Sequence, residues 1–126
     1  MMMDMIAGYR ATMFDGATDL DWLRHGWRAL RLYGRKAKAA MLAGDTAQKA
    51  EMITRADRLL VLMTGLLDTG PGTTLGPALM NIYAVLQRTL LRANAKNDVA
   101  ALDEFDRAIE SLARDMLETP ELRIAS

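Results

Sequence analysis

The run Leu59–Leu67 constrains the fold of this chain more than any other segment, because its nine residues include no charged side chain. On a helix, residues three or four positions apart share a face. Part of this run therefore continues an apolar stripe that starts upstream of it. That stripe comprises Ile53, Ala56, Leu60, Met63 and Leu67. A second stripe, about 100° further round the helix, comprises Leu59, Leu62 and Leu66. Each stripe must be covered by a neighbouring element. The second stripe is covered either by another part of the same domain or by a partner protein.

Helix-start and helix-stop signals divide the chain into four amphipathic segments. The predicted helices cover residues 19–42, 45–68, 77–97 and 98–119. Thr18, Asp45 and Asp98 are the predicted N-caps, and Gln48 completes a capping box with Asp45. Gly44 and Pro120 mark C-terminal ends, Pro77 suits a first helical turn, and the Gly/Pro/Thr-rich segment 69–76 is the one long loop.

The first predicted helix contains two internal glycines, Gly26 and Gly34. Each costs about 1 kcal/mol of helix stability relative to alanine, so we expect both to allow close packing against a neighbouring helix. No segment alternates with period two, and no strand is predicted. The sequence therefore predicts an all-α fold, an antiparallel up-down four-helix bundle, as a single domain over residues 1–126. It comprises an N-terminal lead-in (1–18), the bundle (19–118) and a tail (119–126).

Composition excludes several classes of protein. The 126 residues contain no cysteine and their formal net charge is zero, which gives no reason to expect a nucleic-acid partner. The first residues, Met1–Ile6, lack the pattern of a signal peptide. The apolar run is far shorter than the roughly 20 residues that span a bilayer. We expect a soluble, cytoplasmic protein without direct membrane insertion.

Basic residues are concentrated in the first predicted helix, where Trp22–Gly44 holds six basic residues and no acid. Arg24, Arg28, Arg31, Arg35 and Lys38 form one stripe. The segment from residue 98 to 126 holds eight acids and three arginines, and Asp103, Asp106 and Glu110 flank its apolar stripe. Because first and fourth helices of such a bundle are neighbours, we expect these flanks to pair at their seam. The alternative is a stripe that binds an anionic nucleic acid or membrane.

Residues that could support catalysis or bind a cofactor are sparse. His25 is the only histidine, too few for a bundle di-iron site, and there is no thiolate ligand. Asp68-Thr69-Gly70 matches three letters of the aspartic-protease signature but lacks a β framework. The glycine-rich loop has no Gly-Lys-Ser/Thr and no preceding strand, so a phosphate site is not supported. We expect no enzyme activity, metal or cofactor.

The remaining candidate is an apolar surface. Leu59, Leu62 and Leu66, together with Met52, Met80 and Leu91, could line a groove that accepts the amphipathic helix of a partner. Methionine suits such a groove because its side chain adapts to different shapes. Two alternatives remain: the bundle or the lead-in covers these side chains, or a homodimer buries them.

The block Leu79-Met80-Asn81-Ile82-Tyr83, followed by Leu90-Leu91-Arg92-Ala93-Asn94-Ala95-Lys96-Asn97-Asp98, resembles the third helix and following turn of the flagellar secretion chaperone FliS family. Ala43-Gly44-Asp45 with Lys49, Ile53 and Ala56 is similar to the family's preceding turn and second helix, and Tyr9, Phe14 and Ala17-Thr18 to its N-terminal region. The resemblance extends from Tyr9 to Met116. The chain departs from the pattern at Gly26-Trp27-Arg28-Ala29 and at Met116.

The resemblance implies a cytoplasmic export chaperone that holds the disordered C-terminal segment of flagellin, prevents its premature polymerisation, and delivers it to an export-gate component. It also implies that the segment around Tyr9 lies over part of the client groove and moves aside. The partner-binding residues we predict are Tyr9, Met52, Leu59, Leu62, Leu66, Met80, Tyr83 and Leu91.

Overall fold

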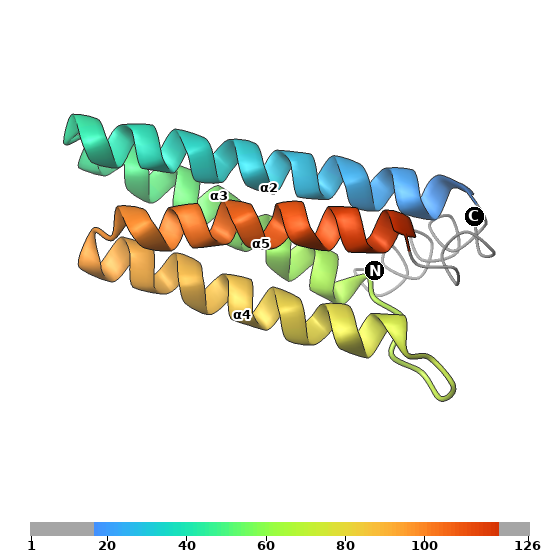
Figure 1. The fold of residues 1–126 in the computed structure, drawn as a ribbon. Coiled ribbons are helices and arrows are strands. Elements are labelled where there is room, and N and C mark those ends of the chain that lie inside the picture. The colour runs from blue at the N-terminus through green and yellow to red at the C-terminus, as the bar shows by residue number, and fades with distance from the viewer. Residues whose placement is uncertain (1–16, 119–126) are drawn as a thin grey trace.

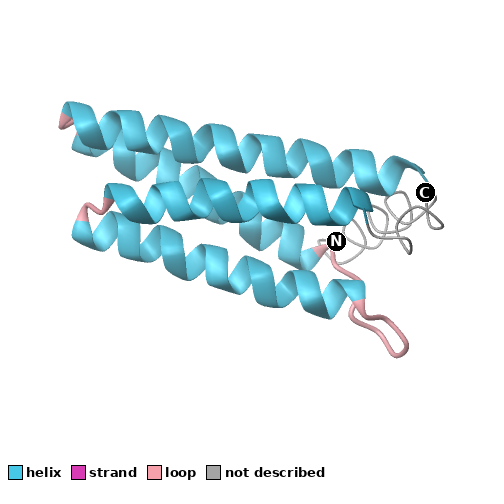
Figure 2. Cartoon of the chain, in the orientation of Figure 1, coloured by secondary structure: helices cyan, strands magenta, loops and turns pink. Residues whose placement is uncertain are grey.

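A computed structural model of the chain describes residues 17–118, so the predicted lead-in, including Tyr9, and the tail 119–126 lie outside the described residues. Four helices make up most of this range: α2 (Ala17–Ala43), α3 (Thr46–Gly65), α4 (Leu75–Lys96) and α5 (Val99–Glu118) (Figure 1). Figure 2 shows only helices and loops in residues 17–118. The predicted all-α, four-helix fold is confirmed.

The helices form a four-sided bundle around one core. α2 packs against α3 and α5, and α4 packs against the same two helices from the opposite corner. Along successive helices the colour of Figure 1 runs in opposite directions, as an up-down arrangement requires. Leucines, methionines and alanines from all four helices fill the interior, together with Trp27, Tyr83 and Phe105.

Several predicted helix ends are confirmed at the level of individual bonds. Asp45 caps α3, where its Oδ1 accepts a hydrogen bond from the backbone N–H of Gln48 at 3.1 Å. Gly44 has a positive φ of 75°, the conformation that favours glycine after a helix. Asp98 Oδ1 accepts a hydrogen bond from the N–H of Ala101 at 3.3 Å, at the start of α5.

Other predicted helix boundaries differ from those in the structure. α3 ends at Gly65 rather than near Asp68, because the chain turns there and buries both Leu66 and Leu67. α4 begins at Leu75, two residues before Pro77. Proline is accepted there because a backbone N–H in the first turn has no partner within its helix. α2 begins at Ala17, so Thr18 lies within the helix, a difference of the size usual at helix ends.

The first apolar stripe of α3 lies wholly in the core, as predicted. Its members Ile53, Ala56, Leu60, Met63 and Leu67 are each at most 6 % exposed. The two internal glycines of α2 allow the close packing that we expected. A Cβ on Gly26 would lie 2.6 Å from Cε of Met63, and one on Gly34 would lie 3.1 Å from Cδ1 of Phe105.

Gly76 provides a stability test of the turn between α3 and α4. A methyl group at this buried position would overlap the backbone carbonyl of Asp68, which cannot move without displacing the loop. We expect Gly76→Ala to lower the free energy of unfolding by about 2 kcal/mol or more in urea denaturation.

Gly65→Ala is the matched control. Nothing lies within 4 Å of the added methyl group and the backbone φ is not positive, so alanine should be neutral or stabilising by up to about 1 kcal/mol. Equal stabilities for the two variants would contradict the close packing of this loop.

Candidate partner-binding face

Apolar side chains gather on the outward side of α3 and α4. Within residues 21–116, the large hydrophobic side chains that remain exposed are Leu32, Leu42, Val61, Leu62, Met80, Val85 and Leu91. Val61 and Leu62 lie on α3, and Met80 and Leu91 lie on α4. We call the exposed side of α3 and α4 that carries Val61, Leu62, Met80 and Leu91, together with the groove between the two helices, the α3–α4 face.

A groove of about 570 Å³ runs between α3 and α4. It is lined by Ile53, Thr54, Asp57, Ala84, Gln87, Arg88, Leu90, Leu91 and Asn94. Thr54 and Ala84 are small, which leaves room between the two helices. The Gln87 side-chain amide donates a hydrogen bond across the groove to Oδ1 of Asp57, at 3.2 Å. This bond fixes how α3 and α4 lie relative to one another at the middle of the groove.

Three of the predicted partner-binding residues are exposed on α3 and α4, and one of them, Leu91, lines the groove. Leu91 is 68 % exposed, Leu62 50 % and Met80 38 %. Leu59 is half-buried and packs against the core. Met80, Ala84, Gln87 and Leu91 follow helical spacing, so they form one row along the groove. Their role in binding a partner stays a prediction.

Three other predicted residues are buried, so the expectation that Met52 and Leu66 line an open groove is wrong, whereas the role of Tyr83 in binding stays a prediction. Met52 is 4 % exposed, Leu66 1 % and Tyr83 0 %. Met52, Leu59 and Leu66 are spaced so that they share a side of α3 with Met63, which lies against Gly26 of α2. The predicted second stripe is therefore not a single exposed surface. Leu66 is buried, whereas Leu62 is exposed.

Sequence reasoning missed Val61, Thr54, Ala84 and the Asp57–Gln87 pair. The available signal was the spacing of Val61 and Asp57, one turn apart on the side of α3 that faces α4. Small and polar residues were passed over because the prediction looked only for surplus large apolar side chains.

Tyr83 takes part in a hydrogen bond across the core. The indole N–H of Trp27 on α2 donates to the Tyr83 hydroxyl on α4, at 3.1 Å, and both side chains are buried. Burial raises the pKa of Tyr83 to about 12, outweighing the opposite effect of the bond from Trp27. The bond joins two helices at opposite corners of the bundle.

Tyr83 should give the protein a distinct alkaline stability profile. Its pKa is about 12 in the folded chain and about 10 when unfolded. The unfolded chain therefore loses this proton first, and the free energy of unfolding should fall by about 1.4 kcal/mol per pH unit between pH 10 and 12. Tyr83→Phe should remove that part of the slope, measured by urea denaturation at each pH.

Below pH 10, Tyr83→Phe should also cost about 1–3 kcal/mol, because it leaves the buried Trp27 N–H without a partner. Tyr33→Phe, at a half-buried position that leaves this bond intact, is the control. An alkaline slope that is identical in the parent chain and in Tyr83→Phe would disprove the assignment.

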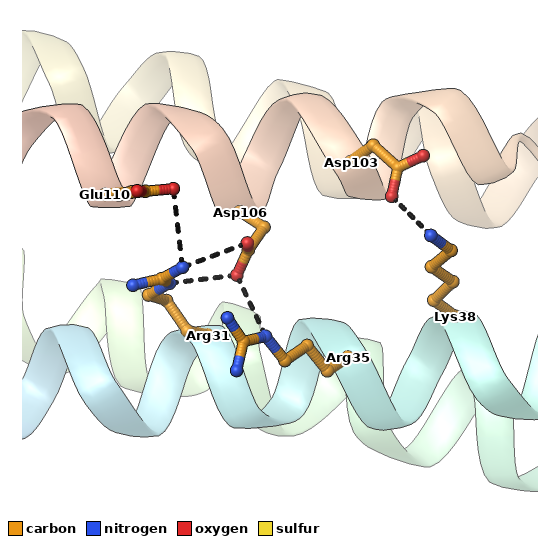
Figure 3. A network of polar contacts seen from close by, with 6 residues as sticks. All are labelled: Arg31, Arg35, Lys38, Asp103, Asp106 and Glu110. Carbon is orange, nitrogen blue, oxygen red and sulfur yellow. Dashed lines mark hydrogen bonds and ion pairs between the residues drawn. The ribbon is translucent and has the colours of Figure 1, made fainter.

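The basic stripe of α2 pairs with the acidic flank of α5, as predicted (Figure 3). Arg31 donates two hydrogen bonds to Asp106, from Nε at 3.0 Å and from Nη2 at 3.2 Å. Arg35 lies 3.5 Å from the same carboxylate, and Lys38 donates to Asp103 at 2.7 Å. The bonds from Arg31 hold the pKa of Asp106 below its usual value, and the bonds to Asp106 raise the pKa of Arg31.

Most basic residues of the stripe pair with acidic residues of α5. Arg31 also lies 3.6 Å from Glu110, and Arg24 lies 3.6 Å from Asp21 on its own helix. Arg28 is exposed and forms no ion pair with the described residues. The pairing therefore accounts for Arg31, Arg35 and Lys38, the part of the stripe that lies against α5.

The part of the chain that the structure describes contains no group of three or more His, Cys, Asp or Glu side chains that could hold a metal ion. His25, the one histidine, is exposed. Between residues 17 and 118, none of the helices combines the length and apolar character needed to cross a membrane.

The described residues thus form a four-helix bundle with an open groove between α3 and α4. The family model "Flagellar protein FliS" matches residues 9–116 of the chain. Since this match covers most of the 126 residues, the chain belongs to the FliS family, which consists of flagellar export chaperones. A comparison with curated proteins gives no match.

Proposed function

We propose that this chain is a cytoplasmic chaperone that binds the disordered C-terminal segment of flagellin on its α3–α4 face. In this proposal it prevents premature polymerisation of its client and delivers it to a component of the export gate, without catalysis. The observation that carries the proposal is the open groove between α3 and α4, on a side of the bundle where Leu91 and other apolar side chains are exposed. Membership of the FliS family supports the choice of client.

The groove has the form that a third helix requires. Two antiparallel helices leave a channel into which the apolar side chains of an amphipathic helix can insert at i, i+3, i+4 and i+7. Ala84 and Thr54 leave space for large client side chains, and Leu91 at 68 % exposure offers apolar area on the rim. Each Å² of apolar surface removed from water contributes roughly 25 cal/mol.

The physical basis of the chaperone activity is masking. Bound apolar side chains of the client cannot pair with another flagellin molecule, so occupancy of the groove alone prevents polymerisation. A client that is disordered when free loses conformational entropy on binding. This cost keeps the affinity moderate for the area buried, which suits a client that must later be released.

The family resemblance adds a second element, that the segment around Tyr9 covers part of the client surface and moves aside. An apolar cavity of about 230 Å³ lies at the end of the bundle where the N-terminal part of α2 meets the α3–α4 loop. Leu23, Leu67 and Leu79 are among its lining residues. We propose that the lead-in reaches the client surface from this end.

Calorimetry with a flagellin C-terminal peptide tests the proposed function. We expect binding with a negative heat-capacity change, because apolar surface is buried. Leu91→Asp should weaken binding at least tenfold, since it places a charge on the rim of the groove.

Leu42→Asp is the matched control, because Leu42 is also a leucine, is 69 % exposed, and lies on α2 rather than on the α3–α4 face. It should bind the peptide as the parent chain does. Absence of heat with the parent chain, or equal weakening by both variants, would refute the proposal.

A further inference from the structure

The charges along the α3–α4 face are unbalanced. α4 contains three basic residues and no acidic one, and its Arg92 is engaged by Glu104 and Asp98 on the side of α5. The two acids of α3 already have partners. Glu51 pairs with Arg55 at 2.8 Å, and Asp57 accepts the hydrogen bond from Gln87.

Two arginines on this face have no counter-charge. Arg58 and Arg88 are exposed, and neither forms an ion pair with the described residues. Arg88 lines the groove, and Arg58 is one helical turn from Thr54, which also lines it. Because Asp57 bonds to Gln87 across the groove, the next residues, Arg58 and Arg88, lie at nearly the same level along α3 and α4.

We propose that the α3–α4 groove selects an amphipathic client helix that carries acidic side chains on both flanks of its apolar face, and that Arg58 and Arg88 bind them. This inference rests on the proposed function and adds the chemistry by which its client is recognised. In this proposal the client's apolar stripe packs against apolar lining residues of the groove, such as Ala84. The two arginines bind the carboxylates on the flanks of that stripe.

The arrangement favours selection as well as affinity. An arginine can hold a carboxylate with two parallel hydrogen bonds, and a client that covers the groove partly removes these pairs from water. A helix of the same hydrophobicity but with basic flanks would place like charges together over both walls, which disfavours the wrong partner. Positive charge at the groove also speeds the encounter with an acidic segment at low salt.

Two peptides and three double variants test this inference by calorimetry. The peptides are the flagellin C-terminal segment and the same segment with its aspartates and glutamates changed to asparagines and glutamines. The variants are Arg58→Glu/Arg88→Glu, the charge-preserving Arg58→Lys/Arg88→Lys, and Arg107→Glu/Arg114→Glu. The last is the matched control, because it makes the same change in net charge at exposed arginines of α5 that lack ion pairs with described residues.

We expect Arg58→Glu/Arg88→Glu to weaken binding of the unmodified peptide at least tenfold and to change binding of the neutralised peptide little. The lysine variant keeps the charge but loses the paired hydrogen bonds, so its affinity should lie between those of the parent chain and the glutamate variant. The α5 variant should keep nearly all of the affinity. Circular dichroism at 222 nm should show all three variants folded, since all four arginines are exposed and none forms an ion pair with the described residues.

Two results would overturn the inference, and they differ in what they imply for the proposed function. If Arg58→Glu/Arg88→Glu binds as the parent chain does while Leu91→Asp does not bind, the groove is used but the arginines do not recognise the client. If the parent chain binds neither peptide, the proposed function fails and this inference fails with it.

Discussion

Burial of the α3 stripe is the constraint on which the rest of the structure depends. Leu60, Met63 and their neighbours on that stripe are at most 6 % exposed, and truncating any of the large ones to alanine would cost about 2–5 kcal/mol. A rotation of α3 about its axis would expose these side chains to water. Val61 and Leu62 are therefore held outward because the opposite side of the helix is committed to the core.

Polar contacts then fix how the helices lie relative to one another. Hydrophobic contact is non-directional, whereas the bonds Trp27–Tyr83, Arg31–Asp106 and Asp57–Gln87 each require one alignment of two helices. Each is worth only about 0.5–3 kcal/mol. Their larger effect is on specificity: Trp27–Tyr83 sets the level of α2 against α4, Arg31–Asp106 sets it against α5, and Asp57–Gln87 sets the two walls of the groove.

Much of this fold follows from the sequence, and particular residues show why. Asp45 and Gly44 predicted a helix boundary because capping is local, and the α3 stripe predicted its own burial because helical spacing is regular. The pairing of α2 with α5 followed from complementary charge on predicted neighbours. Each of these inferences needs only nearby residues or the order of the helices.

The features that the sequence did not predict correctly depend on how the helices pack against one another. Helical spacing identifies a second flank on α3, but only the structure shows that Met52 and Leu66 are buried. Tyr83 finds its hydrogen-bond partner 56 residues away, at Trp27. The groove depends on the small side chains of Thr54 and Ala84, which leave space between helices and give no signal of their own.

Thiol protection tests the central claim, that the α3–α4 face is where a client lies, most directly. The chain has no cysteine, so Leu91→Cys and Leu42→Cys each introduce a single reactive group at matched exposure. With saturating flagellin C-terminal peptide, alkylation of the Leu91→Cys variant should slow at least tenfold, while that of Leu42→Cys stays unchanged. An unchanged rate for Leu91→Cys, with the peptide shown to be bound, would contradict the account.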